Sequence, residues 1–298
     1  MKGVKKMDQN TRIGMEVSLA IGCPVCCDYC PQDLIKSVYQ GPRYFTLDSY
    51  KRTLEVGQVP ITTNQTYMGT CDPYICKDAT KIMRWALQER GHMGSVSTIL
   101  QYCSYEDIDA LAEMKDRLTD CIIHCPAADD RMPGLRVDSE YVEKFKYAIR
   151  VLRGNPGFVL QVYNTAPHPA IYQIWAESGI HIPCFGLHDR AGHLPNLHGP
   201  YVQHGPRSFP IPICGKLFGG HLYPNSDIGC CCNEWAMERI WGNLLKNTHY
   251  EIYHSQKFRD YVKSLQGPDT NPRCRWCHDS FHQINPEDRN KGYDLIGH

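Results

Sequence analysis

Four cysteines lie within one short segment, and three of them have the spacing of cluster ligands. Cys23, Cys27 and Cys30 form a CxxxCxxC pattern in the stretch that begins at Gly22. Three protein thiolates leave one iron of a four-iron cluster open to a small chelating molecule, whereas a structural zinc site or a closed cluster normally takes four protein ligands. The pattern therefore predicts an iron–sulfur cluster with one open coordination position.

Cys26 allows a second interpretation of the same segment. Cys23 and Cys26 form a CxxC pair, and Cys274 and Cys277 form another, so the four could hold a structural zinc ion. If the cluster is present, Cys26 is an incidental thiol, because a fourth ligand would close the iron that must stay open. The strand expected just before the segment favours the cluster.

The composition indicates a folded protein in a reducing compartment. The chain has 298 residues, 42% of them hydrophobic, and its 32 basic and 32 acidic residues give a net charge of zero. General binding to nucleic acid or to a membrane is therefore not expected. The charged N-terminus is unlike a signal peptide, so we expect a cytoplasmic protein. The 16 cysteines are then metal ligands or ordinary buried thiols, the latter expected at Cys71, Cys103, Cys121, Cys125 and Cys184.

Short β-rich runs alternate with helical patterns over the first two thirds of the chain, which is typical of βα units around a parallel sheet. The expected strands are 14–20, 65–69, 95–100, 121–124, 158–163 and 181–185. The expected helices are 47–56, 78–90, 105–118, 140–152 and 168–178, and Ser104 with Asp107 predicts a cap for the third. Such units form a partial barrel or an open doubly wound sheet, and both bind ligands at the carboxyl ends of the strands.

The cysteine loop resembles that of the radical SAM superfamily. The loop follows the first expected strand, has the CxxxCxxC spacing and carries an aromatic residue, Tyr29, before its third cysteine. The resemblance implies that Cys23, Cys27 and Cys30 bind a [4Fe-4S] cluster whose open iron takes the amino and carboxylate groups of S-adenosylmethionine. Enzymes of this family cleave that cofactor reductively to a 5′-deoxyadenosyl radical, which abstracts hydrogen from a substrate.

Residues after the later strands match the family in part. The segment after the second strand lies where the family has a GGEP-like turn for the methionyl amino group, although Thr70 and Cys71 replace small glycines. The resemblance implies cofactor contacts at Tyr29, Gly69, Thr70, Asp72, Pro73 and Thr98. Arg190, past the sixth strand, is the expected catalytic residue and would clamp a substrate anion or hydroxyl. An ordinary βα turn and a solvated loop arginine are the alternatives at these positions.

A second group of cysteines follows a Pro- and Gly-rich break near residues 199–206. Its order resembles that of the SPASM modules and the shorter Twitch modules, which hold an auxiliary [4Fe-4S] cluster. The shorter form fits better because no cysteine follows Cys277. If the triplet Cys230 to Cys232 lies on a strand, its first and third side chains point away from the second. The resemblance implies the ligands Cys214, Cys231, Cys274 and Cys277.

The resemblance as a whole implies a two-part α/β protein. We expect a partial (β/α)6 TIM-like barrel at residues 12–200, a small C-terminal α+β iron–sulfur module at 206–281 and a tail at 282–298. The cysteine order is similar to that of Twitch-bearing 2-deoxy-scyllo-inosamine dehydrogenases. A fully ligated second cluster would accept an electron, so the expected reaction is the oxidation of a small sugar- or alcohol-like substrate.

Other reactions and partners follow from the same resemblance. Sugar epimerisation would need a cysteine that donates hydrogen to the radical. Peptide maturation would use a short peptide as substrate, although the few residues before the first strand offer no room for a leader-binding domain. The expected redox partner is a flavodoxin or a ferredoxin, and no membrane partner is expected. A zinc-stabilised scaffold without catalytic activity is the alternative outside the enzymes.

Overall fold

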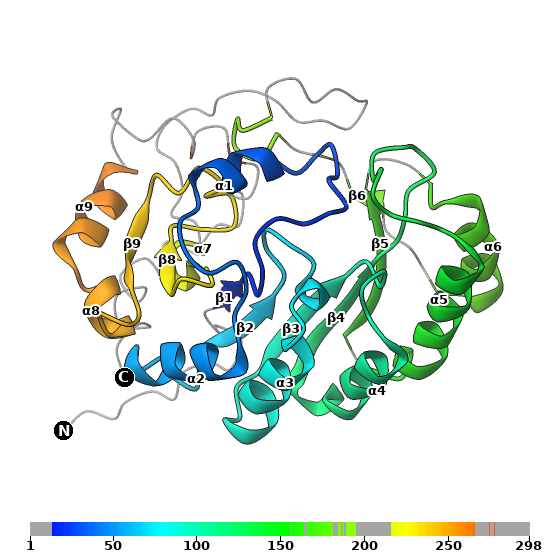
Figure 1. The fold of residues 1–298 in the computed structure, drawn as a ribbon, viewed down its shortest axis with the longest axis horizontal. Helices are drawn as coiled ribbons and strands as arrows, with labels where there is room; N and C mark the ends of the chain where they lie inside the picture. The colour runs from blue at the N-terminus through cyan, green and yellow to red at the C-terminus, as the bar shows by residue number, and fades with distance from the viewer. Residues whose placement is uncertain are drawn as a thin grey trace, which may run out of the picture.

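Six parallel strands run through the described part of the chain and follow one another across the sheet in chain order (Figure 1). The computed structural model describes residues 14–155, 157–163, 166–180, 184–185, 187, 189–194, 216–265, 274 and 277. The strands are β1 (Gly14–Val17), β2 (Asn64–Tyr67), β3 (Gly94–Thr98), β4 (Leu118–His124), β5 (Phe158–Tyr163) and β6 (Cys184–Phe185). Strands that are added on one edge in chain order form the wall of a barrel, whereas a doubly wound sheet reverses its order. The partial-barrel prediction is confirmed.

Five helices cover the outer side of these strands, and consecutive helices contact one another (Figure 1). They are α2 (Leu47–Val56), α3 (Ala79–Arg84), α4 (Tyr105–Glu113), α5 (Ser139–Leu152) and α6 (Pro169–Ser178). The expected helix 78–90 continues past α3 as a π-helical turn at Trp85–Glu89, and the expected helix 105–118 closes with a 3-10 turn at Lys115–Arg117. Ser104 and Asp107 form the predicted cap, in which each side chain bonds the backbone of the other.

A short helix, α1 (Gln32–Val38), follows the cysteine loop and was not expected from the sequence. Its seven residues span two turns, which is too short for a helical period to stand out. Pro31 is its N-cap residue, and Gln32 and Ile35 are its buried side chains. The helix thereby brings the buried side-chain amide of Gln32 next to the cysteine loop.

The C-terminal segment extends the sheet beyond β1. Helix α7 (Lys216–Gly219) leads into β7 (His221–Leu222), which pairs in parallel with β1. Antiparallel pairing then adds β8 (Asp227–Gly229) and β9 (Ile240–Asn243), and α8 (His249–Tyr253) and α9 (Gln256–Ser264) follow. Within the described residues the sheet thus has nine strands in the order β6-β5-β4-β3-β2-β1-β7-β8-β9. The division into domains stays a prediction, but this hairpin hydrogen-bonds directly to the barrel.

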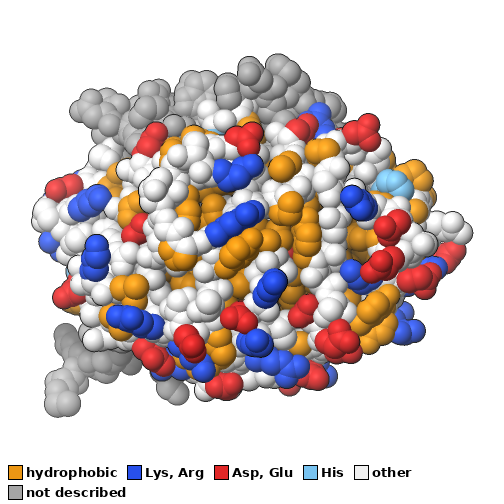
Figure 2. Space-filling view, in the orientation of Figure 1, with side chains coloured by type: hydrophobic (Ala, Val, Ile, Leu, Met, Phe, Trp, Pro, Cys, Tyr) orange, Lys and Arg blue, Asp and Glu red, His pale blue; other side chains and the backbone are white. Residues whose placement is uncertain are grey.

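The surface carries no patch of a single charge on the face seen in Figure 2, where lysines and arginines alternate with acidic residues. Apolar side chains gather near the middle of this face, over the strand ends and the loop after β1. This distribution agrees with the net charge of zero and with a substrate that is recognised locally. No helix among the described residues is both long enough and apolar enough to cross a membrane.

Candidate functional site

The loop between β1 and α1 places its four cysteines differently. Cys23, Cys27 and Cys30 are half-buried, and all three pack against one apolar cluster at the carboxyl ends of the strands. The buried members of that cluster are Val25, Tyr29, Ile99, Met132 and Leu187. Cys26 is exposed, has a φ of 51°, and directs its thiol to the carbonyl of Cys23 at 3.5 Å. The loop thus brings the three cysteines of the CxxxCxxC pattern to one patch and leaves the fourth in solvent.

Hydrogen bonds and a nearby cation favour the thiolate form of Cys23 and Cys30 in this loop. A hydrogen bond from Cys27, opposed by desolvation and assisted by the charge of Arg190, lowers the pKa of Cys30 to about 7. The same hydrogen bond and desolvation raise the pKa of Cys27. A hydrogen bond from Cys71 lowers the pKa of Cys23. Since thiolates are the ligands of iron–sulfur clusters, the donor set fits such a group.

The amide of Gln32 joins the cysteine loop to the turn that follows β2. Its Oε1 accepts a hydrogen bond from the backbone N–H of Cys23 at 3.0 Å, and its Nε2 donates to the carbonyl of Thr70 at 2.5 Å. Gln32 is 5% exposed, and its bond to Thr70 is buried whereas its bond to Cys23 is partly buried. Sequence reasoning missed this residue because its helix was not predicted.

The turn after β2 requires glycine at position 69. Gly69 has a φ of 108°, and a Cβ atom there would lie 2.7 Å from Oγ of Ser18 and 2.9 Å from Cε1 of His221. The hydroxyl of Ser18 accepts a hydrogen bond from the backbone N–H of Thr70 at 3.0 Å and contacts the Thr70 hydroxyl at 2.8 Å. Because Gly69 has no side chain, the Ser18 hydroxyl can approach the turn and hydrogen-bond Thr70.

A buried polar chain connects this turn to strand β7. Nε2 of His221 lies 2.6 Å from Oγ of Ser18, and its Nδ1 lies 3.5 Å from Oε1 of Glu16. Burial lowers the pKa of His221 to about 3, so the imidazole is neutral at physiological pH. The parallel pairing of β1 with β7 sets Glu16 directly beside His221. None of these three residues was predicted, because no local pattern links β1 to a segment so far along the chain.

The carboxylate of Asp72 ties the same turn to the end of β3. It accepts hydrogen bonds from the backbone N–H of Tyr74 at 2.9 Å, from the Thr98 hydroxyl at 2.9 Å and from the backbone N–H of Ile99 at 2.8 Å. Burial raises the pKa of Asp72 despite these bonds. Pro73 begins a 3-10 turn directly after it. Asp72 and Thr98 therefore bond to each other, and their cofactor contacts stay predictions.

Arg190 lies against the cysteine loop. It begins a run of three residues with positive φ, namely 51° at Arg190, 57° at Ala191 and 80° at Gly192. Its Nε donates a hydrogen bond to the carbonyl of Tyr29 at 3.1 Å. This contact places a fixed positive charge beside the thiols, and the predicted role of Arg190 as a substrate clamp stays a prediction.

Three rings border the cysteine loop at the ends of β4 and β5. Tyr29 is buried, and its ring centroid lies 6.1 Å from that of His124 and 5.9 Å from that of Tyr163. The rings of His124 and Tyr163 meet edge to face at 4.6 Å. Desolvation, followed by the charge of Arg190, lowers the pKa of His124 to about 3. His124 and Tyr163 are the last residues of two expected strands, and this position at the carboxyl ends could have marked them as site residues.

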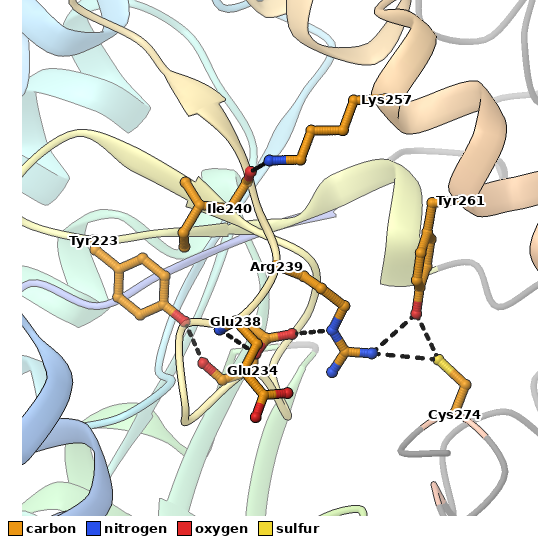
Figure 3. A network of polar contacts seen from close by, with 8 residues as sticks. All are labelled: Tyr223, Glu234, Glu238, Arg239, Ile240, Lys257, Tyr261 and Cys274. Carbon is orange, nitrogen blue, oxygen red and sulfur yellow. Dashed lines mark hydrogen bonds and ion pairs between the residues drawn. The ribbon is translucent and has the colours of Figure 1, made fainter. Parts of the chain in front are cut away.

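Three of the four cysteines predicted to hold the auxiliary cluster are described, and Cys214 lies outside the described residues. The hydroxyl of Tyr261 lies 2.8 Å from Sγ of Cys274, and Nη1 of Arg239 lies 3.9 Å from the same atom (Figure 3). The amide of Asn233 donates to Sγ of Cys277 at 3.3 Å. Polar donors therefore surround these sulfurs, as they do around ligating thiolates.

The cysteine triplet does not lie on a strand. Strand β8 ends at Gly229, so the alternation of side chains expected for a strand does not apply to Cys230, Cys231 and Cys232. A hydrogen bond that the Cys231 thiol donates to Cys230, desolvation and the charges of Cys230 and Cys274 all raise the pKa of Cys231. Cys230 and Cys274 are thus both close to Cys231, and the choice of Cys231 as the ligand stays a prediction.

Comparison with known proteins identifies the fold. No protein-family model and no curated protein matches the sequence. The structure is similar to that of BtrN in complex with AdoMet and 2-DOIA, with 14% sequence identity and a TM-score of 0.55 over 88% of this chain and 91% of BtrN. The chain has the fold of radical SAM enzymes.

Two further structures share this fold. The structure of anSMEcpe with bound AdoMet is 12% identical, with a TM-score of 0.57 over 95% of each chain. The structure of SuiB from Streptococcus suis, bound to the precursor peptide SuiA, is 11% identical, with a TM-score of 0.59 over 91% of this chain and 76% of SuiB. The same fold therefore spans most of the chain.

Proposed function

We propose that the protein is a radical SAM enzyme that holds a [4Fe-4S] cluster through Cys23, Cys27 and Cys30. One observation carries this proposal. Of the four cysteines in the loop, the three with the family spacing are half-buried against one apolar patch, whereas Cys26 is exposed. With S-adenosylmethionine bound, such a cluster supplies the electron that cleaves the cofactor to methionine and a 5′-deoxyadenosyl radical.

The residues around the cysteines have roles that follow from their contacts. Gln32 fixes the cysteine loop against the turn that contains Gly69 and Thr70, the segment proposed to bind the methionyl group. Asp72 fixes the far side of that turn to β3. Arg190 contributes a positive charge beside Cys30 and thereby stabilises its thiolate.

The apolar patch and the rings at the strand ends exclude water from the site. Tyr29 is 3% exposed and packs against His124 and Tyr163. Exclusion of water protects a reactive carbon radical from side reactions. It also keeps His124 neutral, because its pKa is lowered to about 3.

We propose that the substrate is a small sugar- or alcohol-like molecule that is oxidised by two electrons. The second cysteine group, with ligands proposed at Cys214, Cys231, Cys274 and Cys277, would hold an auxiliary [4Fe-4S] cluster that takes one of these electrons. The likeness to BtrN, whose structure contains 2-DOIA and nearly all of whose chain is covered, supports a small molecule. The likeness to SuiB with its precursor peptide favours a peptide as the second candidate. A flavodoxin or a ferredoxin is the proposed electron donor.

Reductive cleavage of S-adenosylmethionine tests the proposal. The anaerobically reconstituted protein is reduced with dithionite, and 5′-deoxyadenosine is measured without any substrate. We expect about eight iron atoms per chain, slow cleavage in the parent protein and in the Cys26→Ala control, and no cleavage in Cys27→Ala. Bound zinc without visible absorbance, or equal cleavage in the two variants, would instead favour the scaffold or another ligand set.

A further inference from the structure

A buried ion pair lies next to the proposed auxiliary cluster. Glu234 is 1% exposed and Arg239 is 9% exposed, and their side chains form an ion pair through Nε of the arginine (Figure 3). The other carboxylate oxygen of Glu234 accepts a hydrogen bond from the backbone N–H of Glu238 at 2.9 Å. The carboxylate is therefore fixed on both sides, and it holds the guanidinium in one place.

The free end of the guanidinium points toward a sulfur atom. Nη1 of Arg239 donates to the hydroxyl of Tyr261 at 3.0 Å and lies 3.9 Å from Sγ of Cys274. The Tyr261 hydroxyl lies 2.8 Å from that Sγ, and toward a ligating thiolate, which carries no proton, the hydroxyl is the donor. Arg239 also stacks over the ring of Tyr261 at 5.8 Å. A cation and a hydroxyl therefore converge on one proposed ligand atom.

Donors at a ligand sulfur change the redox equilibrium of a cluster. Reduction adds one negative charge, so a cation or a hydrogen-bond donor near a ligating sulfur stabilises the reduced form more than the oxidised form. The effect is large where water is excluded, because the low local dielectric screens little. A stabilised reduced form makes the cluster a better electron acceptor.

We propose that Arg239 and Tyr261, acting through Sγ of Cys274, raise the reduction potential of the auxiliary cluster so that it accepts an electron from the substrate radical. The inference rests on the proposed function. After hydrogen abstraction from an alcohol carbon, the substrate radical loses one electron to this acceptor and its hydroxyl proton to solvent, and a carbonyl results. Glu234 is a positioning residue that holds Arg239 against the sulfur.

Redox titration of the auxiliary cluster alone tests this inference. The full chain with Cys23, Cys27 and Cys30 changed to alanine lacks the first proposed ligand set and retains the second, and its reduced cluster is followed by electron paramagnetic resonance. Tyr261→Phe removes the hydroxyl but keeps the ring. The double variant Glu234→Gln with Arg239→Gln removes the cation without leaving a buried carboxylate unpaired. Tyr50→Phe is the control, because it removes a buried hydroxyl that bonds Gln65 in the barrel.

We expect each test variant to lower the equilibrium constant for reduction about tenfold, which shifts the midpoint about 59 mV downward. The Tyr50→Phe control keeps the midpoint of the triple-cysteine parent. Unchanged midpoints in both test variants would overturn the inference and leave the proposed cleavage of S-adenosylmethionine untouched. If the triple-cysteine parent assembled no cluster, the auxiliary cluster itself would be overturned. Formation of 5′-deoxyadenosine by the unmodified protein would then show that the first cysteine site still works.

Discussion

Replacement of Gln32 tests how the cysteine loop is held to the cofactor turn. In Gln32→Leu the backbone N–H of Cys23 and the carbonyl of Thr70 both lose their partners. A buried polar group without a partner costs about 1–3 kcal/mol. Because the Thr70 bond is buried and the Cys23 bond is only partly buried, we expect a loss of about 2–4 kcal/mol in the free energy of unfolding.

The same substitution should weaken cofactor binding. Without Gln32, the loop and the turn are no longer joined, so part of the binding free energy of S-adenosylmethionine is spent on ordering them. We expect about a tenfold increase in the dissociation constant, measured by equilibrium dialysis of the reconstituted protein. The matched control is Gln88→Leu, since Gln88 is exposed and makes one long bond of 3.5 Å to Glu113. If Gln32→Leu and Gln88→Leu lost the same free energy of unfolding and bound S-adenosylmethionine equally well, this role of Gln32 would be refuted.

Three further predictions concern the turn at Gly69, the buried His249 and the second cysteine group. Gly69→Ala should cost about 1–3 kcal/mol in unfolding free energy, because φ is 108° and the Cβ would meet Ser18, whereas Gly154→Ala, with open space around it, should cost almost nothing. Burial lowers the pKa of His249 to about 4 from 6.5, so between those values only the unfolded state takes up the proton and stability falls as the pH falls. Replacing His249 with glutamine should therefore reduce the loss of stability between about pH 7.5 and pH 5 by about 2 kcal/mol, measured by denaturant unfolding at each pH; an unchanged loss would contradict the assigned pKa. Cys231→Ser should lose about four iron atoms per chain while Cys232→Ser keeps them, and the reverse pattern would assign the ligand to Cys232.

The sequence predicted those elements whose physical signal is local. All six parallel strands were expected, since each is a short β-rich run between helical patterns, and α2 begins and ends at the expected residues. The three cysteines of the first loop could be proposed as ligands because their spacing is itself the signal, and the structure places all three against one apolar cluster. Cys26, which was expected to be an incidental thiol, is the exposed cysteine of this loop, and its exclusion from the ligands stays a prediction.

Contacts between distant segments could not be predicted in this way. Ser18 and His221 are 203 positions apart, and only the parallel pairing of β7 with β1 brings them together. Gln32 escaped notice because a seven-residue helix carries too little periodicity. The donors around Cys274 come from a loop and from α9, and neither has a pattern that indicates a contact with sulfur.

The continuous sheet bears on how two cysteine groups could work together. The sequence break near residues 199–206 suggests an appended module, but β7 hydrogen-bonds to β1, and the backbone N–H of Ser18 donates to the carbonyl of Leu222 at 3.0 Å. The first cysteine loop follows β1, the cysteine triplet follows β8, and only β7 lies between these two strands in the sheet. A hinge between barrel and module would let the spacing of the two groups vary. Pairing of β7 with β1 instead restrains it, which would suit the proposed transfer of an electron from a substrate radical to a second cluster.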